Sequence, residues 1–269
     1  MNADFALSIG GAGPIPRGAL RSLRLELASD APDRLWVQTR RAAMAIVPSV
    51  GVAAALQLGP LSFDGRIAST VERSPDGAEP VVALEVESRW ASRARALETA
   101  EELREITDSE AVARLADALG LSAGIAQSRH VHSTLRRIGS PTGFILERAR
   151  ALGWTAAFGR GRVQFGPAIE NAPFREIARA PGTRILAIGQ GERGRFGRLA
   201  LSTLPRVAPL DRLRLTRFGS RADGTYRVAR VEAALDERSV RAEVLFVEDD
   251  RDLARLDLLD GVLSREEAA

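Results

Sequence analysis

The sequence contains no cysteine and no lysine, and the two absences exclude several kinds of site. Without cysteine the chain has no disulfide framework, thiolate zinc site, iron–sulfur cluster or cysteine nucleophile. Without lysine it has no Schiff-base chemistry and no Walker-type phosphate lysine. All 38 basic residues are therefore arginine. Arginine without lysine either serves ion pairs with carboxylates at interfaces or merely reflects genome composition.

The charge balance is nearly even, with 38 basic and 35 acidic residues among 269 and a formal net charge of +3. Arginine alternates with aspartate and glutamate along the chain, as in Arg24-Leu25-Glu26. A protein that binds nucleic acid would concentrate its basic residues on one face. We therefore expect no sequence-specific nucleic-acid binding.

Long apolar runs are scarce as well. Residues 42–63 carry no charge, but Pro48, Gly51 and Pro60 interrupt them, so we expect short strands there and no membrane span. The first residues hold no basic segment ahead of an apolar stretch, so no signal peptide is expected and synthesis in the cytoplasm is the default.

Two motifs match part of a functional pattern. Residues 188–194 fit the glycine spacing of a dinucleotide fingerprint, but too few residues follow before Pro205 for the crossover helix that it requires. We expect a glycine-rich loop and no cofactor. His130 and His132 would share one face of a strand, as a metal pair does, yet no third ligand is obvious. We assign no metal and no catalytic residue, and leave metal binding by this pair open.

Periodicity divides the chain into three regions and a tail. Residues 1–98 read as β structure, since Leu23, Leu25 and Leu27 alternate with charged residues. Residues 99–170 carry helix and hairpin signals, and residues 171–248 return to alternating strands. Residues 249–269 form a C-terminal tail that is either helical or disordered.

Helix signals mark the middle region. Thr99 and Glu102 fit a capping box, so a helix that carries Leu103 and Ile106 is expected. Two further helices and a hairpin should follow. Their signals are Asp108 or Ser109 as an N-cap with Gly120 as a stop, Ser140 and Pro141 as a start with Gly153 as a stop, and strands over 154–158 and 162–165.

The last region repeats the first. Asp223-Gly224 opens a strand that ends at Val231-Glu232, and an alternating strand follows over 240–247. The first region has the same order in Asp64-Gly65, Val71-Glu72 and the strand from Val81. Two similar β units that flank an insert indicate an α+β, mainly β fold.

This order of elements resembles the late control protein D family of contractile phage tails, whose relatives form the hub of phage baseplates and the N-terminal part of type VI secretion spikes. The resemblance spans roughly residues 5 to 248 and implies two tube-type β-barrels that flank the insert. It is carried by the segments 48–58, 65–67, 107–121, 144–167 and 224–232.

The resemblance implies a structural protein of the virion tail, assembled in the host cytoplasm, and not an enzyme. Three copies would form a pseudo-sixfold ring that adapts the sixfold tail tube to the threefold central spike and continues the axial channel. The implied partners are two further copies, the tail tube or distal tail ring, a separately encoded spike and other baseplate proteins, with DNA passing through the channel. The alternatives are a tail-associated cell-wall hydrolase, although no carboxylate pair stands out, and a soluble β-rich ligand-binding module.

Candidate contacts between subunits or rings lie in the last β region. Arg227 and Arg230 occupy opposite faces of one strand if that strand is regular, so at most one faces the channel, and both could instead be solvent-exposed. The glycine-rich loop is a candidate for contact with a neighbouring ring, or else a plain connection. Its candidate residues are Gly189, Gly191, Gly194 and Gly197.

The tail begins with the charged run Asp249-Asp250-Arg251-Asp252, which lacks the glycine and the final glutamate of a calcium loop. We expect this run to be solvated. The leucines that follow it either dock as a helix or are disordered.

Overall fold

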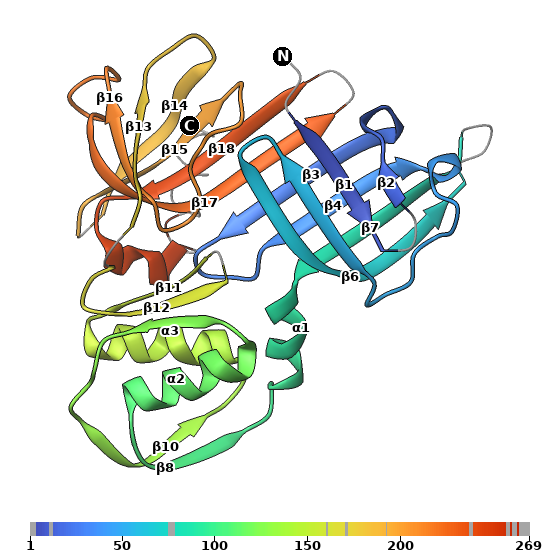
Figure 1. Cartoon of the computed structure of the whole chain (residues 1–269). Helices are drawn as coiled ribbons and strands as arrows, with labels where there is room; N and C mark the ends of the chain where they lie inside the picture. Colours follow the sequence, from blue (N-terminus) through green and yellow to red (C-terminus); the bar gives the residue numbers. More distant parts are fainter. Residues whose placement is uncertain are drawn as a thin grey trace.

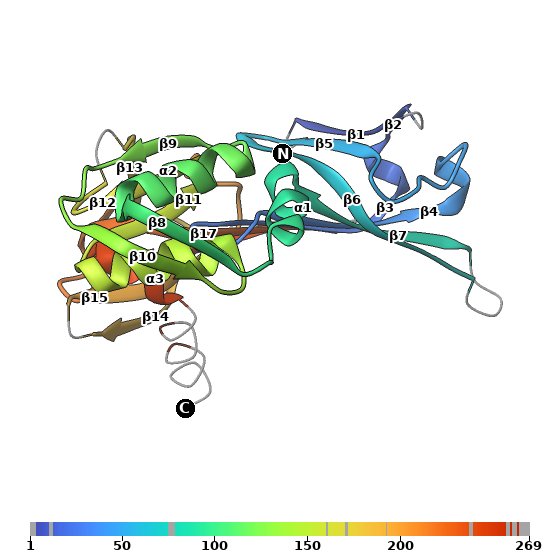
Figure 2. The same cartoon turned by 90° about the horizontal axis from the view of Figure 1, so that it is seen from below.

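The computed structural model describes residues 4–10, 13–74, 79–159, 161–169, 172–191, 193–236 and 239–256, together with Leu259 and Leu263. The chain folds into two β units, an insert between them and a C-terminal segment. Figure 1 shows the insert below the second β unit and joined to the first through helix α1, and Figure 2 shows the same arrangement from below.

The first β unit comprises seven strands. They are β1 (Phe5–Ile9), β2 (Gly13–Ile15), β3 (Leu20–Ala28), β4 (Arg34–Arg40), β5 (Ala53–Leu58), β6 (Leu61–Arg73) and β7 (Val81–Ser88), with short 3-10 turns at Arg17–Ala19 and Arg41–Ala43. The second β unit comprises β13 (Phe174–Ala178), β14 (Thr183–Gln190), β15 (Arg195–Leu201), β16 (Arg212–Thr216), β17 (Gly224–Asp236) and β18 (Val240–Val247).

The segment between the two β units contains three helices and five strands, of which α1 precedes residue 99 and connects the first β unit to the insert. They are α1 (Arg89–Ala96), β8 (Glu101–Thr107), α2 (Asp108–Leu119), β9 (Ser122–Ile125), β10 (Val131–Arg137), α3 (Pro141–Leu152), β11 (Thr155–Gly159) and β12 (Arg162–Gly166). Strands β8 and β10 pair with each other, and β11, β12 and β9 form a second small sheet.

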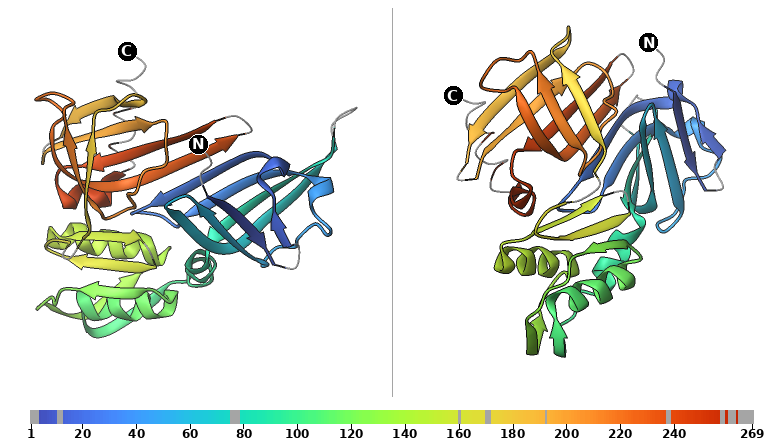
Figure 3. Two further views of the ribbon diagram at one scale, coloured as in Figure 1. Left: turned by 45° about the horizontal axis from the view of Figure 1, so that its top comes forward. Right: turned by 60° about the vertical axis from the view of Figure 1, so that its left-hand side comes forward.

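One thirteen-stranded sheet contains every strand of both β units. The units join where β3 pairs antiparallel with β17, from Ser22 opposite Asp236 to Ala28 opposite Arg230. Figure 3 shows these long strands running side by side through the middle of the molecule. The mainly β fold is thus confirmed. Among the described strands the pairing runs from β14 to β2 without closing, so the two barrels are not established.

The two β units share one strand order. The first runs β3, β4, β7, β6, β5, β1, and the second runs β14, β15, β18, β17, β16, β13. Strands β6 and β17 both have 13 residues, and β7 and β18 both have 8. Each long strand also shifts register once, between Ile67 and Ser69 or between Val228 and Arg230. One difference is that β13 pairs parallel with β16, whereas β1 pairs antiparallel with β5.

The register shift in β17 overturns the expectation for Arg227 and Arg230. Val228 and Val231 lie three residues apart, yet both belong to the large apolar cluster, because the bulge at Ala229 adds a residue to one strand. Each arginine is adjacent to one of these valines and therefore points to the opposite face. Arg227 and Arg230 thus share a face, contrary to the expectation for a regular strand.

Three apolar clusters form the interior. The largest spans both β units, and a second lies inside the insert. A third packs the C-terminal segment against the second β unit and β11, with Leu253, Leu256 and Leu263 fully buried. Within the described residues no helix is both long and apolar enough to span a membrane.

The helix at 141–152 begins and ends as its caps predict, and the helix at 108–119 ends at the expected Gly120. Ser140 accepts a hydrogen bond from the backbone of Gly143, and Gly120 and Gly153 close their helices in the left-handed conformation. The helix expected after Thr99 is wrong, because residues 101–107 form strand β8. Glu105 has φ +46°, and this kink lets Leu103 and Ile106 face the same apolar cluster although they are three residues apart.

The N-cap of α2 is Thr107, one residue before the expected position. Thr107 and Glu110 form a full capping box. We expect Thr107→Ala to lower the free energy of unfolding by about 1 kcal/mol, because it leaves a backbone donor unpaired at the helix start. Thr107→Ser keeps the hydroxyl and is the matched control. Urea unfolding measures both, and equal losses in the two variants would contradict a role for the cap.

Candidate interaction surfaces

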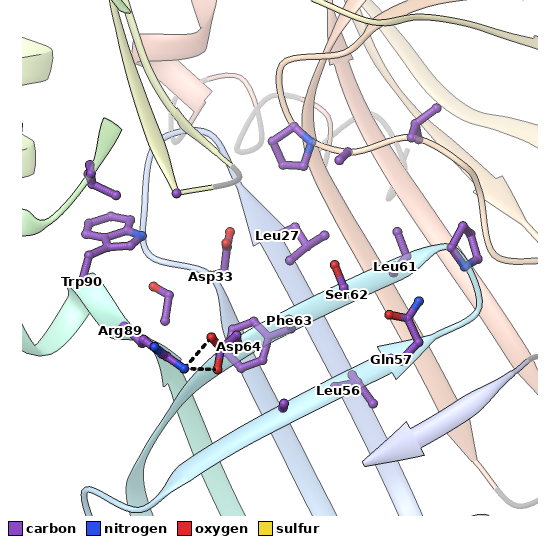
Figure 4. A pocket seen from close by; sticks show the side chains of 18 of the residues that line it. Leu27, Asp33, Leu56, Gln57, Leu61, Ser62, Phe63, Asp64, Arg89 and Trp90 are labelled. Atoms are coloured by element: carbon purple, nitrogen blue, oxygen red, sulfur yellow. Dashed lines mark hydrogen bonds and ion pairs between the residues drawn. The ribbon is translucent and has the colours of Figure 1, made fainter. Parts of the chain in front are cut away.

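A pocket of about 1190 Å³ lies where the two β units and the insert meet. Figure 4 shows Asp33, Phe63 and Asp64 of the first β unit and Trp90 of α1 among the residues that line it. At its rim Arg89 forms an ion pair with Asp64 at 2.8 Å, and both side chains are exposed. The second β unit contributes Arg175 and the loop 206–209. Residues from three parts of the fold therefore line the pocket, which we call the junction pocket.

Asp33 is the titratable group that the pocket perturbs most. Its Oδ1 accepts a hydrogen bond from the backbone N–H of Ala28 at 3.0 Å, which fixes the turn between β3 and β4. Burial raises the pKa of Asp33 to about 7, and nearby Glu26 adds to the effect. The backbone bond acts in the opposite direction but is too weak to offset burial. This carboxyl therefore titrates far closer to neutral pH than an ordinary aspartate, whose pKa is 3.8.

Arg227 is buried and bonded within the chain. Its Nε and Nη2 each donate to Asp250 at 2.8 Å, and Nη1 donates to the carbonyl of Leu210 at 3.0 Å. Asp250 also accepts a bond from the backbone of Ile169 at 3.3 Å. Arg227 therefore anchors the C-terminal segment to β17 and to the end of the insert. The assignment of Arg227 to a contact between subunits stays a prediction.

The charged run at the start of the tail is not solvated throughout, contrary to expectation. Asp252 is 5% exposed and Arg227 covers Asp250. Residues 250–255 form a short 3-10 helix that Asp249 caps by accepting a bond from the backbone of Arg251. Most of the residues after 256 lie outside the described part of the chain.

Arg230 lies at the junction between the β units. Its guanidinium is 3.6 Å from Glu26 and 3.8 Å from Asp30, both of the first β unit. Burial nevertheless raises the pKa of Glu26, and Arg230 opposes that shift. A second ion pair, between Arg24 and Glu232 at 2.8 Å, crosses the same junction. Arg230 thus connects the two units of one chain, and its contact with another subunit stays a prediction.

The glycine-rich segment forms the end of the β14–β15 hairpin, so the residues of the fingerprint match lie on antiparallel strands and their turn. A Cβ on Gly189 would lie 2.6 Å from the ring of Phe196, and one on Gly197 would lie 2.7 Å from the ring of Phe246. The backbone of Gly191 donates to Gly194 across the turn. Two of the glycines are thus required by ring packing, and their contact with a neighbouring ring stays a prediction.

The histidine pair lies on and beside β10. The rings of His130 and His132 are 4.5 Å apart and meet edge to face, and His132 Nε2 lies 3.0 Å from Asp108. Burial opposes ionisation of Asp108, but hydrogen bonds from His132 and Arg148 outweigh it and hold the pKa of this carboxyl below its ordinary value. No group of three metal-ligating side chains occurs among the described residues.

Comparison with known proteins gives matches by structure alone. No family model matches the chain, and no curated protein matches it in sequence. A type VI secretion component of Escherichia coli, described as similar to bacteriophage T4 tail proteins, superposes with a TM-score of 0.68 at 11% identity. The match covers 90% of this chain and 76% of that one.

Two phage-type tail proteins match as well. The tail protein of Neisseria meningitidis has a TM-score of 0.67 at 10% identity, with 91% of this chain and 96% of that chain covered. The tail protein of prophage MuSo2 from Shewanella oneidensis has a TM-score of 0.65 at 8% identity, with 92% and 98% covered. The resemblance drawn from the sequence is confirmed at the level of the fold, and the chain has the fold of tail and type VI secretion proteins.

Proposed function

We propose that the protein is the structural hub of a phage or phage-derived tail. Three copies form a ring in which each chain supplies two tube-type β units, so six similar units surround an axial channel. The observation that carries this proposal is the repeated strand order of the two β units, because a duplicated unit lets a threefold assembly present nearly sixfold symmetry. The neighbours, which are tail and secretion proteins, support it.

In this role one side of the ring binds the tail tube or distal tail ring, and the other binds the central spike. Residues 1–98 and 171–248 serve as the two tube-type domains, residues 99–170 as the insert and residues 249–269 as the C-terminal tail. The chain acts by shape and pairing and carries out no catalysis. Its place is the virion tail, after assembly in the host cytoplasm.

The mass of the purified protein tests the ring directly. Light scattering should give three times the mass of one chain, and negative-stain images should show a ring with a channel and an apparent sixfold end view. A single-chain mass that persists after addition of the spike protein would overturn the proposal. Hydrolysis of peptidoglycan that Asp33→Asn abolishes would favour the hydrolase alternative, and a small molecule bound in the junction pocket of a monomer would favour the ligand-binding module.

A further inference from the structure

Strand β17 is divided between two partners on the same side. Its first part, Gly224 to Arg227, pairs with β16, and its second part, Arg230 to Asp236, pairs with β3 of the other unit. The second part therefore receives its neighbour from outside its own unit. This is how the two β units join.

Strand β6 has the same division but lacks the second partner. Its first part, Leu61 to Arg66, pairs with β5, and the backbone of Ile67 bonds to residues 51 and 52. No described strand pairs with that side of Ser69 to Arg73. Val71, in the middle of this stretch, is a large apolar residue that is 46% exposed.

Strand β14 ends the sheet and pairs only with β15 among the described strands. It occupies the position in the second unit that β3 occupies in the first. Among the described strands β2 and β13 also have an unpaired edge. Only the edges of β14 and of the second part of β6 are the counterparts of the two edges that meet at the internal junction. Unpaired strand edges are templates for pairing with another chain.

The geometry points to pairing between Ser69–Arg73 of one copy and β14 of a second copy, antiparallel and in the register of the internal β17–β3 junction. The inference rests on the proposed ring and specifies its interface between chains. The occupant is a second copy because the same two kinds of edge already pair within one chain. The contact uses different surfaces on the two copies, so it propagates around a ring.

The bulges in β6 and β17 identify which residue of β6 is equivalent to Val231 of β17. Ile67 and Val228 are the last residues before the register shift in β6 and β17. Thr70 and Val231 are each the second paired residue after it, so they are equivalent. In the internal junction Val231 lies opposite Leu27.

Residues paired across the sheet identify which residue of β14 is equivalent to Leu27 of β3. From Ile67 a row of directly paired residues crosses β7 and β4 and reaches Leu25 in β3. From Val228 the equivalent row crosses β18 and β15 and reaches Ile188 in β14. The residue two positions beyond Leu25 is Leu27, and two beyond Ile188 is Gln190. The proposed register therefore places Thr70 opposite Gln190.

This register gives the exposed Val71 a complementary neighbour. Val71 falls opposite Gly189, which has no side chain because the ring of Phe196 occupies the space beside it. The apolar side chain of Val71 on one edge would thus lie opposite a glycine, which has no side chain to clash with it, on the other edge. Two of the candidate ring contacts, Gly189 and Gly191, lie in this stretch.

Disulfide cross-linking tests the register, because the native chain has no cysteine. Directly opposite residues on antiparallel strands are about 4.5 to 5.5 Å apart between Cα atoms, which suits a disulfide. In the full chain, Thr70→Cys with Gln190→Cys should form disulfide-linked dimers and trimers on oxidation. Thr70→Cys with Arg184→Cys is the matched control, since the second cysteine is then displaced by about 20 Å along β14. This variant should form no disulfide-linked dimers or trimers.

Arg24→Cys with Ala234→Cys reports whether oxidation succeeds, because these residues lie opposite each other within one chain. A three-chain mass without the Thr70–Gln190 cross-link, while the internal pair does oxidise, overturns the edge pairing and leaves the ring proposal standing. Equal cross-linking of the control pair also overturns it. A single-chain mass, alone and with the spike, overturns both.

A second variant tests the same edge without cysteine. Val71→Lys places a charge in the middle of the free stretch of β6, a change that blocks edge pairing in sheets. We expect the three-chain mass to fall to that of one chain while the far-UV spectrum is unchanged. Val131→Lys alters a comparably exposed valine on β10 of the insert and should leave the mass at three chains. A Val71→Lys protein that keeps the three-chain mass contradicts the inference.

Discussion

Replacing Arg227 with leucine lowers the free energy of unfolding by about 3 kcal/mol, because it strands a partly buried carboxylate. Arg227 is 6% exposed and makes two 2.8 Å bonds to Asp250. The change also removes the donor to the carbonyl of Leu210. Urea unfolding measures the loss, and limited proteolysis should cut near residue 250 in the variant before it cuts the native protein.

Two further variants separate the buried ion pair from a general effect of lost charge. Arg251→Leu removes an exposed arginine that pairs with Asp249, two residues away, and it should leave the unfolding midpoint unchanged. Adding Asp250→Leu to Arg227→Leu removes the stranded carboxylate and should recover part of the lost stability. A double variant no more stable than Arg227→Leu would show that the cost lies elsewhere.

Asp33→Asn should raise stability at pH 8 and leave it nearly unchanged at pH 4. The native Asp33 has a pKa of about 7 against an ordinary value of 3.8. Well below pH 3.8 the carboxyl is protonated in both the folded and the unfolded chain, and at pH 4 only part of the unfolded chain has lost the proton. As the pH rises toward 7 only the unfolded chain loses this proton, so Asp33 lowers stability across that window.

The size of the gain follows from the shift. A pKa that is higher by about three in the folded chain than in the unfolded chain corresponds to about 4 kcal/mol. Partial solvent access to Asp33 reduces the expected gain in the free energy of unfolding to the order of 2 kcal/mol. Asparagine keeps the acceptor for Ala28, so the turn should survive. Asp64→Asn removes an exposed carboxyl from the same pocket and is the control. Urea unfolding at both pH values measures the difference, and an equal effect of Asp33→Asn at pH 4 and pH 8 would rule out titration as its cause.

Local signals in the sequence predicted local structure well. Ser140, Pro141 and Gly153 bound α3 because caps act through hydrogen bonds within a few residues. Leu23, Leu25 and Leu27 predicted β3 because one face of that strand packs in the core. The helix expected after Thr99 failed, since a kink at Glu105 gives a strand the three-residue spacing of a helix.

Long-range contacts could not be predicted in the same way. Arg24 and Glu232 are 208 residues apart, and no periodicity in either strand identifies the other as its partner. Asp250 lies in a run of charges that is typical of a solvated surface, and only the fold brings Arg227 to it. The bulge at Ala229, which decides the faces of both candidate arginines, also has no local signal in the sequence.

Because β3 and β17 belong to one polypeptide, the contact between them forms at a rate that does not depend on protein concentration. A six-unit ring built from separate single units would need five bimolecular associations before its last contact closes, each with its own loss of translational and rotational freedom. The proposed ring of three chains needs two, since the covalent connection within each chain supplies three of the six contacts at high effective concentration. Assembly can therefore begin at a lower concentration of subunits, and a broken internal junction closes again before the two units diffuse apart.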